Sequence, residues 1–201
     1  MSEIKNVVFD VGRVLIDFCY VDFFNLLRQR GAEIVDEEDF SAQVGLIGYE
    51  CGEISNSEFL NRVNELMNDP LPDDQLVAAW NSLFTSVPAM LNFAKGLKAY
   101  CRVYLLSNTS ALHWEYLQQQ FSLHQYCHDL LASYQVGYMK PAAEIFTAAA
   151  EQFNIDPEAT VFVDDKQENV AGALACGWNG IWHRDRMETT KRLRELTGRD
   201  V

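Results

Sequence analysis

Short apolar runs that end on polar residues recur along this chain, and they restrict its fold more than any other feature. The runs cover residues 6–9, 102–106, 129–133, 160–163 and 180–182. Apolar runs without polar alternation are typical of strands buried on both faces of a parallel sheet. Stretches with helical spacing lie between them, at residues 112–121, 142–153 and 167–176. The alternation predicts an α/β fold with a doubly wound parallel sheet and right-handed crossovers.

The segment from residue 18 to residue 86 has a different character. It contains no convincing strand, and its helix-start signals are Ser55 with Glu58, and Asp73 or Asp74. The aromatic residues expected to form a core within it are Phe23, Phe24 and Trp80. We therefore expect a helical domain, residues 18–86, inserted after the first strand of an α/β core domain made of residues 1–17 and 87–201.

Composition excludes several classes of protein. The net charge of −13 repels nucleic acid and anionic lipid, so neither nucleic acid nor a membrane is an expected partner. No apolar run approaches the roughly 18 residues of a membrane span, and the first residues lack a signal-peptide pattern, so a cytoplasmic location is expected. The five cysteines are scattered, which argues against a zinc site or a disulfide framework. Oligomeric state is not indicated.

The polar residues that follow the predicted strands are the candidate site. In an open parallel sheet, ligands bind beyond the carboxyl ends of the strands, where the strand order reverses. The residues at those ends are Asp10, Ser107, Asn108, Asp164 and Asp165, and Lys140 follows the third strand after a short loop. We expect these side chains to converge.

A cluster of this composition suits phosphate chemistry with a metal ion. Three carboxylates in one crevice repel one another unless a cation neutralises them, and oxygen ligands suit Mg²⁺. The net charge of the chain repels an anionic substrate. The metal ion and Lys140 would supply the local positive charge that such a substrate needs in order to bind. Ser107 and Asn108 can donate hydrogen bonds to phosphate oxygens, and an aspartate can act as a covalent nucleophile.

Four motifs in this order resemble those of the haloacid dehalogenase-like (HAD) hydrolase superfamily. They are Val7-Val8-Phe9-Asp10-Val11-Gly12-Arg13-Val14, Leu106-Ser107-Asn108, Lys140-Pro141 with Glu144-Ile145-Phe146, and Val163-Asp164-Asp165 continuing to Gly172. The helical insert is similar to that family's small cap, and Gly52-Glu53-Ile54-Ser55 reads like a cap segment. The resemblance implies a Rossmann-like core and a Mg²⁺-dependent phosphatase that acts on a small phosphorylated metabolite. The subgroup most similar in motif one is a set of sugar-phosphate phosphatases.

The resemblance also implies a role for each site residue. Asp10 would be the nucleophile, forming an aspartyl phosphate. The implied metal ligands are Asp10, the carbonyl group of Gly12, Asp165, and Asp164 either directly or through water. The residues that would hold the phosphate are Ser107, Asn108 and Lys140, of which Ser107 and Lys140 would also take part in catalysis.

Gly12 departs from the usual pattern of the superfamily. Most of its phosphatases carry a second aspartate there, which protonates the leaving group and then activates water; losing such a group costs about 10²–10⁴-fold in rate. Either the substrate has a good leaving group, such as the anomeric hydroxyl of a hexose 1-phosphate, or the chain is a weak or inactive binding protein. Under the first hypothesis, Gly12→Asp raises turnover most for poor leaving groups.

Other functions fit the motifs less well. A 2-haloacid dehalogenase needs no metal, so the pair Asp164 and Asp165 would be superfluous. A mutase needs the missing acid–base aspartate, and a phospho-receiver domain has its acidic pair on the first strand instead.

Several residues also have a purely structural interpretation. Ser107 and Asn108 can serve as an N-cap for the helix that follows them. Arg13 either touches substrate or faces solvent. The residues expected to have no chemistry are His113, His124, His128 and His183, and Trp114 and Trp182 are expected to be packing residues. The cap residues Glu50, Cys51 and Glu53 cannot be placed relative to the site from sequence.

Overall fold

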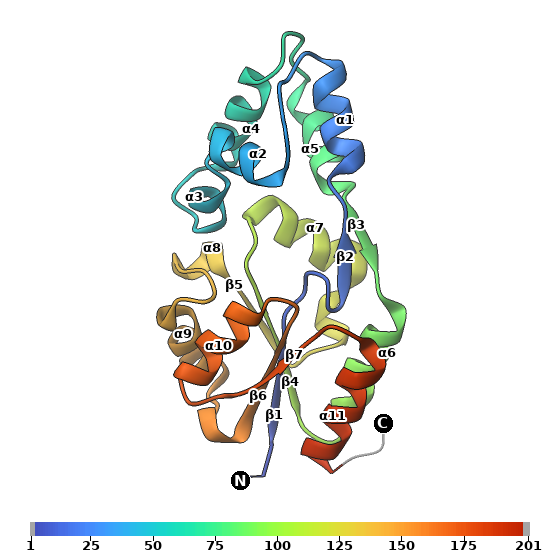
Figure 1. The fold of residues 1–201 in the computed structure, drawn as a ribbon, viewed down its shortest axis with the longest axis vertical. Coiled ribbons are helices and arrows are strands. Elements are labelled where there is room, and N and C mark those ends of the chain that lie inside the picture. Colours follow the sequence, from blue (N-terminus) through green and yellow to red (C-terminus); the bar gives the residue numbers. More distant parts are fainter. Residues whose placement is uncertain (1–2, 199–201) are drawn as a thin grey trace.

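A five-stranded parallel sheet forms the centre of the structure, a computed structural model that describes residues 3–198 (Figure 1). Its strand order is β5-β4-β1-β6-β7. The strands are β1 (Asn6–Phe9), β4 (Arg102–Ser107), β5 (Asp129–Ala132), β6 (Thr160–Asp164) and β7 (Asn179–Trp182). These are the five predicted strands, and the α/β doubly wound fold class is confirmed.

The chain reverses its direction of travel across the sheet beside β1. From β1 it moves outward to β4 and β5, and it then returns to the other side of β1 to form β6 and β7. Asn6 is in register with Arg102 of β4 on one side and with Thr160 of β6 on the other. The carboxyl ends of β1 and β6 therefore flank the switch point at which ligands bind in such sheets.

Two layers of helices cover the sheet because its strands are apolar on both faces. Val7 and Phe9 pack toward α6 (Pro88–Leu97), α7 (Ala111–Phe121) and α11 (Arg186–Thr197). Val8, between them, packs toward α9 (Ala143–Phe153) and α10 (Gln167–Ala175) on the opposite face. Short helical turns complete this part of the fold: α8 (Ser133–Val136), η1 (Leu123–Gln125) and η2 (Pro157–Ala159).

Three helices of the core were predicted, and α7, α9 and α10 follow these predictions closely, with one exception at an N-terminus. The third of them, α10, ends at Ala175, one residue before the predicted end at Cys176. The N-cap of α7 is Ser110 rather than Ser107 or Asn108, so the N-cap interpretation of those two residues is wrong. Ser107 remains in strand β4, and both residues are left for the site.

A separate group of helices stands above the sheet in Figure 1 and has its own hydrophobic core. Its members are α1 (Val21–Gln29), α2 (Glu37–Val44), α3 (Leu46–Glu50), α4 (Asn56–Glu65) and α5 (Asp73–Asn81). We call this group the helical unit. Phe23, Phe24 and Trp80 are buried inside it, as expected. Ser55 caps α4 by accepting a hydrogen bond from the Glu58 amide, also as expected.

Two details of this region differ from the prediction. Asp73 and Asp74 do not cap α5; they lie in its first turn, after Pro72 as the N-cap, where their charges still favour the helix dipole. A two-stranded antiparallel ribbon of β2 (Ile16–Phe18) and β3 (Phe84–Ser86) was not predicted. The three-residue strands are too short to produce a sequence pattern, and they lie at the two junctions between the core and the helical unit. The exact domain boundaries stay a prediction.

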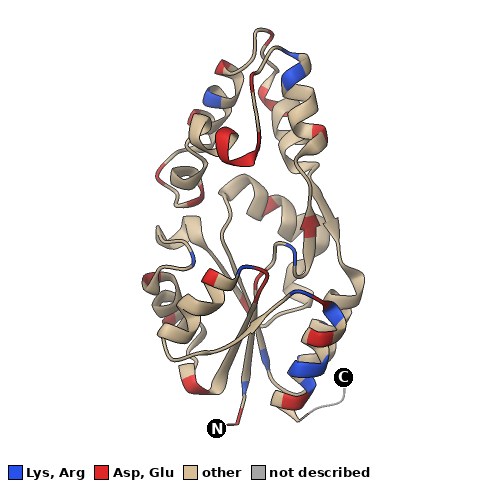
Figure 2. Cartoon of the chain, in the orientation of Figure 1, with Lys and Arg blue, Asp and Glu red and all other residues tan. Residues whose placement is uncertain are grey.

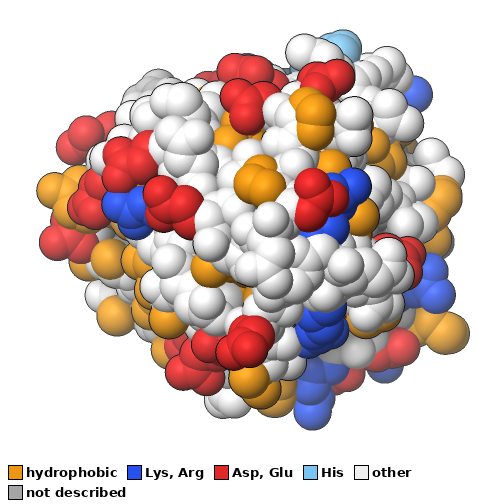
Figure 3. All heavy atoms as spheres, turned by 90° about the horizontal axis from the view of Figure 1, so that it is seen from above, with side chains coloured by type: hydrophobic (Ala, Val, Ile, Leu, Met, Phe, Trp, Pro, Cys, Tyr) orange, Lys and Arg blue, Asp and Glu red, His pale blue; other side chains and the backbone are white. Residues whose placement is uncertain are grey.

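Charge is distributed unevenly over the molecule. Figure 2 shows acidic residues on both the core and the helical unit, whereas α11 carries several basic ones. Seen from above, the face formed by the helical unit displays many acidic side chains (Figure 3). Among the described helices, none is long and apolar enough to cross a membrane.

Candidate active site

Three carboxylates from two strand ends meet at the switch point. One oxygen each from Asp10, Asp164 and Asp165 lies within 4.8 Å of the others. Asp10 directly follows β1, and its amide donates to the Val163 carbonyl group of β6 at 2.8 Å. The two strands are thus joined up to the point where the carboxylates emerge, which explains why the sequence could place these residues together.

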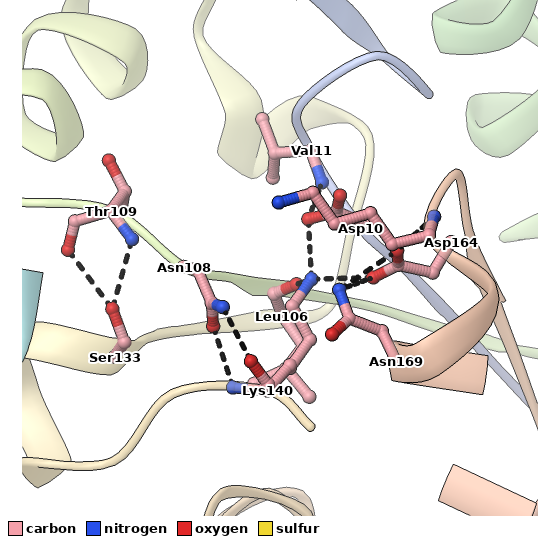
Figure 4. Close-up of polar contacts among 10 residues, drawn as sticks. Asp10, Val11, Leu106, Asn108, Thr109, Ser133, Lys140, Asp164 and Asn169 are labelled. Carbon is pink, nitrogen blue, oxygen red and sulfur yellow. Dashed lines mark hydrogen bonds and ion pairs between the residues drawn. The ribbon is translucent and has the colours of Figure 1, made fainter. Parts of the chain in front are cut away.

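Lys140 lies in the middle of this cluster and is buried (Figure 4). Its ammonium group donates to Asp10 Oδ1 at 2.7 Å, to Asp164 Oδ2 at 2.8 Å and to the Leu106 carbonyl group at 3.0 Å. All three of its hydrogens therefore have acceptors. The single lysine bridges the carboxylates that arrive from β1 and β6.

The backbone of Lys140 is held by Asn108. The Asn108 side chain donates to the Lys140 carbonyl group at 2.9 Å and accepts from the Lys140 amide at 2.8 Å. This reciprocal pair positions the loop that delivers the lysine. The neighbouring Ser107 is buried at the end of β4, and its hydroxyl group makes no hydrogen bond with the described part of the chain.

Asp164 has more partners than the sequence indicated. Besides Lys140, its carboxylate accepts from Asn169 Nδ2 at 3.0 and 3.1 Å and from the Lys166 amide at 2.8 Å. Asn169 is a site residue that the sequence analysis missed as such. It lies in the first turn of α10, which begins directly after the two aspartates, and that position was the available signal.

Asp165 is half-buried, and its backbone is fixed from β7. Trp182 Nε1 donates to the Asp165 carbonyl group at 2.9 Å. Trp182 is 42% exposed, so its prediction as a packing residue is wrong. By contrast, Trp114 is buried in the core as expected.

The site carries more negative than positive charge. Burial raises the pKa of Asp10 to about 7, against the opposing effect of Lys140, and burial together with Asp164 raises the pKa of Asp165. Burial lowers the pKa of Lys140, but the charges of Asp10 and Asp164 outweigh it and raise that pKa above its usual value. Three carboxylates and one ammonium group leave two negative charges when all are ionised. A divalent cation with a preference for oxygen ligands fits this donor set.

An aromatic ring lies close to Gly12. A Cβ there would lie 3.0 Å from the ring of Phe18. The guanidinium group of Arg13, an exposed residue, lies 4.5 Å from the centre of the same ring. A side chain at position 12 therefore requires the Phe18 ring to shift.

Two cavities adjoin the cluster. A small one of about 60 Å³ is lined by Gly12, Phe18, Glu50, Ser107, Asn108 and His113, among others. A larger one of about 430 Å³ lies between the helical unit and the core. Its lining includes the aromatic Tyr20, Phe24 and Phe40, the acidic Glu37 and Glu38, and Lys140. Glu50 lines both cavities, so the structure places this residue where the sequence could not.

His113 lies between the helical unit and the core. It is buried, its Nε2 is 3.0 Å from the Trp80 carbonyl group, and its ring stacks on Trp80 at 4.1 Å. Burial lowers its pKa to about 3. The neutral ring donates one hydrogen bond here, and the absence of a chemical role for His113 stays a prediction.

Comparisons with known proteins agree with this geometry. Residues 4–177 match the family described as haloacid dehalogenase-like hydrolase. A D-ribitol-5-phosphate phosphatase of Bacteroides thetaiotaomicron is 33% identical in an alignment of 176 positions that covers 83% of this chain and 85% of the relative. A sesquiterpene phosphatase of Aspergillus oryzae is 26% identical over 202 residues, covering 98% of both chains.

A solved structure of a HAD family enzyme has a fold similar to that of this chain. A HAD family enzyme of Bacteroides thetaiotaomicron, in complex with magnesium and inorganic phosphate, superposes with a TM-score of 0.79. It is 31% identical and covers 92% of this chain and 98% of its own. The core and the helical unit together thus have a counterpart with the same overall arrangement.

Proposed function

We propose that this chain, which belongs to the haloacid dehalogenase-like hydrolase family, releases phosphate from a small phosphorylated metabolite by way of an aspartyl phosphate on Asp10. The chain is a magnesium-dependent phosphatase, as the family match, the phosphatase relatives and the magnesium–phosphate complex of its structural neighbour indicate. The substrate, the covalent step and the residue roles are the proposal.

The observation that carries the proposal is the position of the Asp10 carboxylate. It lies at the end of the central strand, 2.7 Å from Lys140 Nζ, and shares its crevice with Asp164 and Asp165. A carboxylate held in this way can present its free oxygen to a phosphorus atom while the lysine restrains the other oxygen. Such positioning is the main contribution of a protein to phosphoryl transfer.

The remaining residues then divide into those that hold the metal and those that hold the phosphate. Asp10, Asp165, Asp164 and the Gly12 carbonyl group would hold Mg²⁺, which neutralises the charge that develops on the transferring phosphoryl group. The hydroxyl group of Ser107, which has no hydrogen-bond partner among the described residues, would bind a phosphate oxygen, and Lys140 would do so in exchange for one of its three present acceptors. Asn108, whose amide group is engaged with Lys140, contributes at least by positioning that lysine.

The larger cavity supports a polyol or sugar phosphate as the substrate. Aromatic rings such as Tyr20 and Phe40 offer flat apolar surfaces, and Glu37 and Glu38 offer acceptors for hydroxyl groups. Small polar groups placed in a mainly apolar pocket give such recognition its specificity. A hexose 1-phosphate is the specific candidate, because its anomeric hydroxyl leaves readily and Gly12 provides no acid.

The test measures phosphate release from a panel of phosphate esters, with magnesium and with EDTA. The panel contains p-nitrophenyl phosphate, hexose 1- and 6-phosphates, pentitol 5-phosphates and a prenyl phosphate. We expect sugar 1-phosphates to give the highest kcat/KM, and Asp10→Asn to abolish turnover of every ester. Asp22→Asn, an exposed aspartate of α1, is the matched control. Undiminished turnover by Asp10→Asn would contradict the nucleophile assignment, and preference for the prenyl ester would contradict the substrate class.

A further inference from the structure

Glu50 is a residue of the helical unit that lines the small cavity beside the candidate site. It is the last residue of α3, and the cavity that it lines is also lined by Gly12, Ser107 and Asn108. Among the residues that line this cavity, Glu50 is the only carboxylate. Because Ser107 also lines this cavity, a phosphate bound at Ser107 would border it.

We propose that Glu50, supplied by the helical unit, is the general acid and base of the reaction, in place of the side chain that Gly12 lacks. This proposal rests on the function of Asp10 proposed above. It assigns a chemical role to a residue outside the four motifs, and it extends the reaction from sugar 1-phosphates to esters with poorer leaving groups.

The backbone of Glu50 is fastened directly to the phosphate-binding part of the core. Ser133, which is completely buried, donates its hydroxyl hydrogen to the Glu50 carbonyl group at 2.6 Å. The same hydroxyl oxygen accepts from the Thr109 amide at 2.9 Å. One side chain thus ties Glu50 to the loop that follows Ser107 and Asn108.

The turn after Glu50 also packs closely against the core. Gly52 has a φ of +74°, and a Cβ at this position would come within 2.4 Å of the Tyr134 carbonyl group of α8. Only glycine allows so close an approach in this backbone conformation. The contact holds α3 against α8, which lie one above the other in Figure 1, and so keeps Glu50 at the cavity.

The surroundings of the Glu50 carboxyl group suit proton transfer. The described residues offer it no hydrogen bond and no salt bridge. Burial raises its pKa to about 7; Lys166 and Lys140 act against this rise, and Asp10 adds to it. A carboxyl group with a pKa near neutrality can both give and take a proton at the working pH. Structural carboxylates in loops are normally ionised and exposed.

Glu50 would give up one proton and regain one proton in each turnover. Asp10 attacks phosphorus, the bond from phosphorus to the ester oxygen breaks, and the Glu50 carboxyl group gives its proton to that oxygen. Glu50, now a carboxylate, next takes a proton from the water that attacks the phosphorylated Asp10. Inorganic phosphate leaves, Asp10 is a carboxylate again, and Glu50 is protonated as at the start.

Glu50→Gln, which keeps the shape of the side chain but cannot carry the proton, provides the test. We expect kcat/KM for an alkyl phosphate such as glycerol 2-phosphate to fall by about 10²–10⁴-fold. The first turnover of p-nitrophenyl phosphate, whose leaving group needs no proton, stays fast. Because hydrolysis of the aspartyl phosphate still needs the base, the variant gives a burst of one nitrophenolate per enzyme, followed by slow turnover. The trapped phosphoryl group is detected by intact-protein mass spectrometry.

Controls separate this proposal from the function on which it rests. Glu53→Gln, on an exposed residue of the same turn, should behave as wild type. Full activity of Glu50→Gln on alkyl phosphates overturns the role of Glu50 and leaves Asp10 untouched. Equal losses on alkyl and aryl esters without a burst, together with weaker competitive inhibition by inorganic phosphate, also overturn it, because they indicate a positional role. Turnover that survives Asp10→Asn refutes the proposed function instead.

Discussion

Lys140 Nζ lies 2.7 Å from the carboxylate of Asp10, although the two residues are 130 positions apart in the chain. The same ammonium group contacts Asp164, so one buried cation joins the ends of two adjacent strands. Carboxylates this close would repel each other in a buried crevice without a cation between them. The lysine therefore assembles the site before any substrate arrives.

Removing this cation should destabilise the protein when no metal is present. We expect Lys140→Met to lower the free energy of unfolding by about 3–5 kcal/mol in EDTA, because two buried carboxylates lose their partner. Saturating magnesium should reduce the difference in free energy of unfolding between Lys140→Met and the wild type, since the ion replaces part of the lost positive charge. Urea denaturation with and without magnesium measures both effects. Lys95→Met, on an exposed lysine of α6, is the control, and equal stability of the two variants in EDTA would contradict the prediction.

Asn169 should matter for metal binding although it is not expected to touch the ion. Its amide group donates to both oxygens of Asp164 and so orients that carboxylate. Partners that orient a metal ligand typically contribute about 10–100-fold in affinity. We expect a loss of this size for Asn169→Ala, measured by isothermal titration calorimetry with magnesium. The exposed Asn92→Ala should bind magnesium like the wild type.

Magnesium binding should release protons at mildly acidic pH. The pKa of Asp10 is raised to about 7 by burial, so below that pH the metal-free site holds a proton that Mg²⁺ must displace. Apparent affinity should therefore rise as pH increases through 7 and level off above it. Calorimetry in buffers of different ionisation enthalpy measures the released proton directly. Asp10→Asn should bind magnesium with a smaller pH dependence; an unchanged dependence would assign the proton to another group.

The folded protein should lose stability in acid through His113. Burial lowers the pKa of this residue to about 3, whereas the unfolded chain has the ordinary value of about 6.5. The unfolded state thus binds more protons between these values, and stability falls as pH decreases through this window. Between pH 7 and pH 5, the titration of His113 should lower the free energy of unfolding by about 2 kcal/mol. Denaturation curves should be less pH-dependent for His113→Gln than for wild type, whereas the exposed His124→Gln should keep the wild-type dependence.

An aspartate at position 12 should substitute for Glu50 if space is made for it. Phe18 leaves only 3.0 Å for a Cβ at Gly12, so the substitution is combined with Phe18→Ala. In the Glu50→Gln background, we expect Gly12→Asp with Phe18→Ala to raise turnover most for alkyl phosphates and least for p-nitrophenyl phosphate. The triple variant is compared with Glu50→Gln carrying Phe18→Ala alone. Equal gains on both ester types would contradict the acid–base explanation.

Much of the core could be predicted because its signals are local. A strand buried on both faces must be apolar along its whole length, so strands such as β1 and β6 are visible as runs of residues. Parallel strands that share a sheet end at the same edge, and this brought Asp10, Asp164 and Asp165 together in prediction as in structure. The short ribbon of β2 and β3 was missed because three residues carry no such pattern.

The sequence by itself determined the fold class, the family and the group of carboxylates around Lys140, because each follows from a run of adjacent residues and the topology of a parallel sheet. Only the tertiary structure decided what completes the site. The contact that places Glu50 joins residues 83 positions apart, and the Trp182 contact joins two strand ends. Such contacts depend on how the helical unit and the core loops pack against one another. That packing is a property of many distant side chains at once, and no local pattern records it.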